Sequence, residues 1–188
     1  MKQYWLFLFL LAALPARAQN PYYINYTISD GLPSDNVYSV FQDDDGLIWF
    51  TTDVGIVRYD SKSFQLFNTD DGLSDNEVFR LSKDSKGRMW MHTLNGKPCF
   101  LYKNKIFNEH NSALLRQIKG SGHVVDFYED REKNIYLSFR SGEIFIIDPS
   151  DNVKRKNNQI SHWGVWKSDT LYTIHLNKIT NMDYGISV

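Results

Sequence analysis

The acidic run Asp43, Asp44 and Asp45 is the clearest candidate for cation chemistry in the sequence. In the loop of a helix-loop-helix calcium site, the twelfth position is a glutamate that binds the ion through both carboxylate oxygens. Counted from Asp43, that position is Val54, so the run does not fit such a site. Aspartate followed by Gly46 is instead typical of a tight turn between two strands. We therefore predict a hairpin turn here rather than a calcium site.

The other residue types that could do chemistry lack the spacing that an active site or metal centre needs. None of the five histidines forms an HxH or HxxxH pair, the spacings that allow two imidazoles to reach one metal ion. The GxSxG turn of serine hydrolases and a phosphate-binding glycine loop are also missing from the sequence. We predict no catalytic residue, no metal site and no cofactor in this chain.

The elements around the acidic turn read as strands. Runs rich in β-branched and aromatic residues alternate with glycine and aspartate turns. The predicted strands cover residues 37–42, 47–52, 56–59 and 64–67. Side chains alternate across a strand, and residues 47–50 are apolar on both faces, so we expect this strand to be covered on both sides. The unit is predicted to be a four-stranded antiparallel meander.

This unit is repeated along the chain. Trp90 lies 41 positions after Trp49, and Gly96 lies 41 positions after Gly55. A weaker third copy follows the first by 87 positions, with Tyr136 in the place of the tryptophan. Four-stranded repeats of about 40 residues are the sequence signature of β-propeller blades. We predict an all-β fold, an incomplete propeller of about three blades plus a partial fourth.

The predicted domain boundaries follow the repeats. Blade-like units are expected at about residues 26–67, 68–107, 120–155 and, in part, 156–188, within a domain spanning 19–188. Between the second and third units, Asn111 or Ser112 could cap a short helix over residues 113–118, closed by Gly120. A propeller closes with four or more blades. We therefore expect the chain to be a fragment of a larger receptor, with assembly from several chains as the alternative.

The first unit resembles the two-component regulator propeller repeat, whose pattern is GL, then N and V, then D, G, WxxT and a final GLxxxD. The matching positions here are Gly31, Leu32, Asn36, Val37, Val40, Asp43, Gly46, Trp49, Thr52, Gly55 and Asp60. The second unit keeps most of the pattern but has Glu77 in place of the asparagine, and the third lacks the GL and the tryptophan. The spacing Asp44-x-Gly46-x-x-Trp49 also resembles the Asp-box of sialidase-type propellers, which is a folding device.

The N-terminus has the pattern of a secretory signal peptide over residues 1–18. A positive Lys2 precedes a short apolar run, and Ala16-Arg17-Ala18 provides the cleavage pattern of small residues. An uncleaved anchor is the alternative. We expect a periplasmic or otherwise extracytoplasmic location. The single Cys99 cannot form an internal disulfide, and we predict that it is a buried small apolar residue.

Propeller topology locates a predicted binding face. The turns between the second and third strands share one end of each blade with the links between blades, and loops on a rigid scaffold often carry recognition. The predicted ligand-binding residues at this rim are Asp35, Asn36, Asp53, Asp75, Asn76 and Asn95. The alternative is that these side chains only satisfy the loop backbone. Tyr38 and Phe79, next to these loops, are predicted to be blade core.

The resemblance implies the periplasmic sensor part of a sensor histidine kinase or hybrid two-component system, with no catalysis of its own. The ligand would be an unknown small molecule, with an oligosaccharide as one candidate, and the full-length receptor would self-associate. We expect no nucleic-acid partner, because the slightly negative net charge of -1 argues against a polyanionic partner, and we expect membrane contact only through a C-terminal part outside this chain. The alternatives are a secreted propeller enzyme of lyase or glycosidase type acting on glycans, with carboxylates on the loop rim, and a structural protein-interaction propeller.

Overall fold

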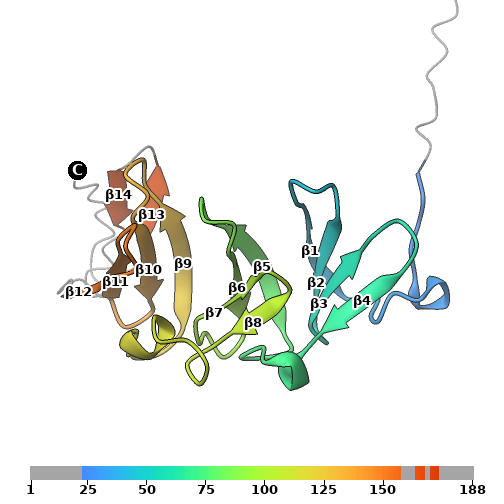
Figure 1. Ribbon diagram of the computed structural model, residues 1–188, viewed down its shortest axis with the longest axis horizontal. Coiled ribbons are helices and arrows are strands. Elements are labelled where there is room, and N and C mark those ends of the chain that lie inside the picture. Colours follow the sequence, from blue (N-terminus) through green and yellow to red (C-terminus); the bar gives the residue numbers. More distant parts are fainter. Residues whose placement is uncertain (1–22, 158–163, 168–169, 174–188) are drawn as a thin grey trace, which may run out of the picture.

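The computed structural model describes residues 23–157, 164–167 and 170–173 (Figure 1). Three four-stranded antiparallel sheets and a two-stranded sheet follow one another along the chain, and each sheet is a simple meander. The predicted all-β class, an incomplete propeller, is confirmed. The predicted signal peptide lies outside the described residues, and of the predicted partial fourth unit only two short strands are described.

We call the three complete sheets blades 1 to 3. Blade 1 contains β1 (Val37–Gln42), β2 (Ile48–Thr52), β3 (Ile56–Tyr59) and β4 (Phe64–Phe67). Blade 2 contains β5 (Val78–Lys83), β6 (Met89–Thr93), β7 (Cys99–Tyr102) and β8 (Lys105–Phe107). Blade 3 contains β9 (Val124–Glu129), β10 (Ile135–Phe139), β11 (Glu143–Ile147) and β12 (Val153–Asn157). Beyond it, β13 (Gly164–Lys167) pairs with β14 (Thr170–Thr173).

The blades stand side by side as in a fan (Figure 1). The turns that join the first and second strands of the blades lie along the upper edge of this view, and the links between blades lie along the lower edge. The links carry three short 3-10 helices, η1 (Ile28–Asp30), η2 (Thr69–Asp71) and η3 (Leu115–Gln117). We call the end with the links and the β2–β3 and β6–β7 turns the link rim, and the other end the hairpin rim.

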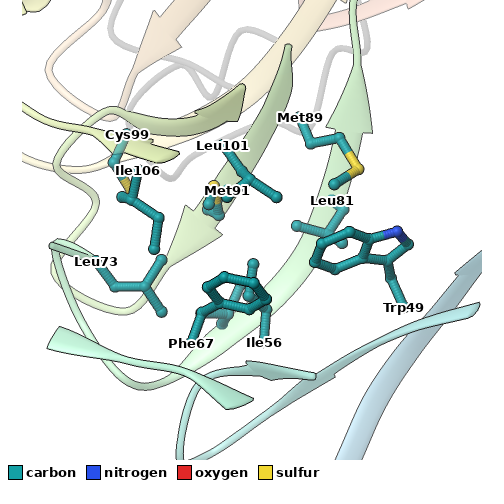
Figure 2. Close-up of a cluster of buried hydrophobic side chains, with 11 residues drawn as sticks. Trp49, Ile56, Phe67, Leu73, Leu81, Met89, Met91, Cys99, Leu101 and Ile106 are labelled. Atoms are coloured by element: carbon teal, nitrogen blue, oxygen red, sulfur yellow. The ribbon is translucent and has the colours of Figure 1, made fainter. Parts of the chain in front are cut away.

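The hydrophobic core consists of two clusters, one on each side of blade 2. The first lies between blades 1 and 2 and is shown in Figure 2. The second lies between blades 2 and 3 and includes residues next to η3. In β6, Met89 and Met91 belong to the first cluster and Trp90 to the second, so this strand is covered on both faces. In β2, Trp49 is buried but Ile48 and Phe50 are only half-buried, because they face away from blade 2.

The two repeat tryptophans occupy equivalent positions. The indole of Trp49 donates its N–H to Asp43 Oδ2 at 2.8 Å, and that of Trp90 donates to Asp84 Oδ2 at 2.9 Å. In blade 3 the hydroxyl of Tyr136 replaces the indole and donates to Asp130 Oδ2 at 2.9 Å. Each aspartate thus closes a hairpin turn and holds the aromatic ring of the next strand. The predicted turn at residues 43–46 is confirmed, with Gly46 at a φ of 80°.

Two sequence-based expectations need correction here. The aspartate that binds the indole is Asp43, whereas Asp44 of the Asp-box spacing points outward to an ion pair with Lys83 at 2.6 Å. The helix predicted over residues 113–118 is only η3, a single 3-10 turn, because so short a segment cannot nucleate a stable α-helix. Its N-cap is Leu114, which has no side-chain acceptor, rather than Asn111 or Ser112, although Ser112 Oγ accepts from the N–H of Leu115 at 3.3 Å.

The prediction for Cys99 is confirmed, because its side chain is fully buried in the first cluster. Ser74 Oγ lies 3.2 Å from the thiol sulfur. Helices in the described part of the chain are limited to these 3-10 turns, and none of them could span a lipid bilayer.

Candidate ligand-binding rim

The link rim begins with the two 3-10 turns, which the predicted site residues hold in place. In the first link, Asp35 Oδ1 accepts from the N–H of Ile28 at 3.1 Å. In the second link, Asn76 Oδ1 accepts from the N–H of Thr69 at 2.8 Å. Asn76 follows Asp35 by 41 positions. An aspartate and an asparagine therefore accept the same hydrogen bond in successive repeats. Both side chains cap the first N–H of a short turn, which water would otherwise have to satisfy.

Hydrogen bonds join the turns between the second and third strands to the links. On blade 1, Asp53 accepts from Ser34 Oγ at 2.6 Å and from Asn36 Nδ2 at 2.8 Å. These two donors lower the pKa of the Asp53 carboxyl, because they stabilise its charged form. Asp53 is therefore a carboxylate at neutral pH.

Blade 2 makes the same junction with a different set of atoms. Asp75 accepts from the N–H of Glu77 at 3.2 Å and from that of Asn95 at 3.0 Å, and Asn95 donates to the carbonyl of Ser74. The structure thus gathers the six predicted residues into two groups of three, one on each blade. Most of the polar atoms of these side chains form hydrogen bonds within the loops, as expected if the side chains only satisfy the loop backbone. A ligand-binding role for these residues stays a prediction.

A cavity of about 750 Å³ opens at the link rim beside η3. It is lined in part by Asn95, Lys97, Arg116 and Lys119, of which only Asn95 was among the predicted residues. Lys97 forms an ion pair with Glu109 at 2.7 Å across this region. The cavity depends on how the long link from blade 2 to blade 3 folds back, and no repeat of the sequence pattern predicts that.

The prediction that Tyr38 and Phe79 are blade core is wrong. Their side chains are 44% and 41% exposed, and their rings lie 5.3 Å apart at an angle of 57°. The Tyr38 hydroxyl donates to Glu77 Oε1 at 2.8 Å, which raises the pKa of the phenol. The reason is a β-bulge, because the pairing of β1 with β2 and that of β5 with β6 skip these two residues. A bulge breaks the alternation of strand faces on which the prediction relied.

His92 and Cys99, which could act as a base and as a nucleophile, lie inside blade 2. Burial lowers the pKa of His92 to about 4, so its ring is neutral at pH 7. Burial raises the pKa of the Cys99 thiol, which disfavours the reactive thiolate. Among the described residues, no three His, Cys, Asp or Glu side chains are grouped so that they could hold a metal ion.

The decisive comparison is with protein families. Residues 31–54 and 72–95 match the family described as the two-component regulator propeller. These segments are two-component regulator propeller repeats. Each match runs from the link through the first two strands to the following turn, so it contains the aspartate and the tryptophan that share a hydrogen bond. The sequence-based resemblance is confirmed for these two repeats. A search of the curated proteins gave no significant match.

Solved structures with the same fold include two extracellular domains from B. thetaiotaomicron. The domain of the hybrid two-component system BT3049 is 22% identical, with a TM-score of 0.61 over 83% of this chain. That of the hybrid two-component system BT4673 is 16% identical, with a TM-score of 0.59 over 75% of this chain. The chain spans 23% and 21% of the lengths of those two chains. At these identities, the likeness is one of fold.

Proposed function

We propose that this chain is part of the extracytoplasmic, ligand-sensing module of a two-component signal-transduction receptor and has no catalysis of its own. The observation that carries this proposal is the pair of two-component regulator propeller repeats, packed against each other as neighbouring blades. Both solved structures described above are named as extracellular domains of such systems, which supports the same role. The kinase activity of the receptor would lie outside this chain.

The link rim is the proposed site of sensing. The Asp53 and Asp75 hydrogen bonds hold its loops to the turns of the blades, and Asp35 holds the first link together, so a ligand would meet a preformed surface. The ligand is a small molecule, with an oligosaccharide as one candidate. Binding there would shift blades relative to one another and, in a self-associated receptor, change the output of a distant kinase.

The test compares gene expression in the bacterium that carries this gene with a deletion strain, grown on a panel of single nutrient sources. We expect the deletion to abolish the induction of a defined gene set on one nutrient source. Unchanged transcription on every source would contradict the proposal. Cleavage of a glycan by the purified chain would instead favour the secreted enzyme.

Matched variants test the rim. Asp35→Asn removes a charge but keeps the bond to the 3-10 turn, because Asn76 already makes this bond in the next repeat. We expect Asp35→Asn combined with Asp53→Asn to weaken the induction, and Asp45→Asn on the hairpin rim to leave it unchanged. If the rim and control variants change the induction equally, the link rim is not the site of sensing.

A further inference from the structure

The first strand of every complete blade contains a β-bulge at the same repeat position. The residues skipped by the strand pairing are Tyr38 in β1, Phe79 in β5 and Val125 in β9. All three are large apolar residues, and their side chains are 44%, 41% and 36% exposed. A bulge turns a side chain away from the face it would otherwise share. We call these residues the bulge row.

The bulge row includes an aromatic corner shared by two blades. The rings of Tyr38 and Phe79 meet at 57° with their centroids 5.3 Å apart. The hydroxyl of Thr51 in blade 1 donates to the carbonyl of Phe79 in blade 2 at 3.2 Å, which fixes the bulge of blade 2 against blade 1. Glu77 Oε1 accepts from the Tyr38 hydroxyl at 2.8 Å, while Glu77 Oε2 accepts no hydrogen bond from the described residues.

The charge around this corner is negative. Residues 28–36, 53–55 and 68–79 form most of the link rim of blades 1 and 2, and they contain no Lys, Arg or His. The same segments carry seven carboxylates, Asp30, Asp35, Asp53, Asp70, Asp71, Asp75 and Glu77. The β6–β7 turn of this rim adds Lys97, which is paired with Glu109 at 2.7 Å. Hydrogen bonds from neutral donors hold several of these groups but do not cancel their charge. The nearest arginine along β5, Arg80, is paired with Asp126 at 3.4 Å.

We propose that the Tyr38 and Phe79 rings of the bulge row, together with Glu77, form a binding site for the ammonium group of a small organic cation. This inference rests on the proposed ligand-sensing function and names the chemistry of the ligand. A cation over an aromatic face is attracted by the ring quadrupole, and a carboxylate beside the rings adds Coulomb attraction. Among the described residues, no arginine or lysine is stacked on either ring, and the two side chains are 44% and 41% exposed, so a ligand can reach them. An anionic ligand would be repelled by the same carboxylates.

The test titrates the full chain with choline and with 3,3-dimethylbutan-1-ol, its neutral isostere. The aromatic resonances of Tyr38 and Phe79 are followed by NMR and assigned with the Tyr38→Leu and Phe79→Leu variants. We expect saturable shifts of both rings with choline, and binding about tenfold tighter than that of the neutral alcohol. Equal affinity for the two probes, or no shift of either ring, would overturn the inference. Larger shifts with a neutral disaccharide than with choline would overturn it as well.

Matched variants test whether the Glu77 carboxylate attracts the cation. We expect Glu77→Gln to weaken choline binding about fivefold and to leave binding of the neutral alcohol unchanged. Glu132→Gln, which removes an exposed carboxylate on the hairpin rim, should change neither. If both carboxylate variants weaken choline equally, the site is wrong. Choline binding without any role in signalling would count against the proposed function but not against this site.

Discussion

Trp90 and Arg88 show how single side chains join the blades. Asp84 accepts from the indole of Trp90, from the guanidinium of Arg88 and from two backbone N–H groups of its own turn. Arg88 also donates to Asp151 at 2.9 Å, in the turn between β11 and β12, and its guanidinium lies 5.4 Å from the Trp90 ring. Asp43 in blade 1 holds Trp49 without a buried cation beside it. We therefore expect the aspartate at this repeat position to contribute more to stability in blade 2 than in blade 1.

We predict that Asp84→Ala destabilises the chain by about 3 kcal/mol, because it leaves the buried Arg88 without its nearest counter-charge. Asp43→Ala should lower the free energy of unfolding by only about 1 kcal/mol, since it mainly removes hydrogen bonds at a half-exposed turn. Urea denaturation of the two variants measures the difference. Equal losses of unfolding free energy in both variants would show that the buried ion pair adds nothing to stability.

His92 predicts a pH dependence of stability. Its pKa is lowered by burial to about 4, so the unfolded chain binds the proton more readily than the folded chain does. The contribution to stability is fully present above about pH 6.5 and is lost as the pH falls toward about 4. At pH 5 the loss should be about 2 kcal/mol relative to pH 7.5. Chemical denaturation of His92→Gln at both pH values should show a change smaller by this amount, and an unchanged pH dependence would be evidence against it.

At the scale of elements, the strands of blade 1 could be predicted because apolar residues alternate with turn residues. The second strand was predicted to begin at Leu47, and β2 begins at Ile48. The bulges at Tyr38 and Phe79 could not be predicted, because an inserted residue shows no pattern of its own and its direction is set by packing against the next blade. The rim residues could be predicted as a group from topology, whereas the cavity beside η3 depends on the path of one long link.

The junction between blade 2 and blade 3 depends on a glycine. Gly96 has a φ of 63°, and a Cβ at this position would lie 2.3 Å from the Cα of His123 at the start of blade 3. We predict that Gly96→Ala costs about 3 kcal/mol or more, because two backbones would have to separate. Gly87→Ala is the matched control, since Gly87 has a φ of 79° but no atom within 4 Å of the added Cβ. That variant should lower the free energy of unfolding by about 1 kcal/mol. Similar decreases of the melting temperature in both variants would show that the close approach of Gly96 to His123 does not matter.

At the scale of the whole molecule, the blades differ in how fully their neighbours cover them. Blade 2 has a hydrophobic cluster on each face, while the far face of blade 1 holds the buried Val57 among half-buried residues such as Ile48, Phe50, Tyr59 and Phe64. Tyr26 from the segment before η1 packs on this far face, with its ring 5.0 Å from that of Tyr59. Stability should therefore be highest in the middle blade.

Native-state hydrogen exchange measures this difference. We expect the amides of β6 to exchange at least about tenfold more slowly than those of β2, because opening β6 exposes two clusters and opening β2 exposes one. Uniform protection across both blades would mean that they unfold as one unit.

The hydrogen-bonded tryptophan and the aliphatic pair beside it point to opposite sides of the same strand. Trp49 meets Met89 and Met91 of the following blade, and Trp90 meets Ile135 and Leu137 of the one after. Blade 2 thus presents the Trp90 ring to blade 3 and the flexible Met89 and Met91 side chains to blade 1. A tandem duplication of one unit would recreate a fitting junction on both of its sides, so genes of this kind can lengthen by whole copies without redesigning any core.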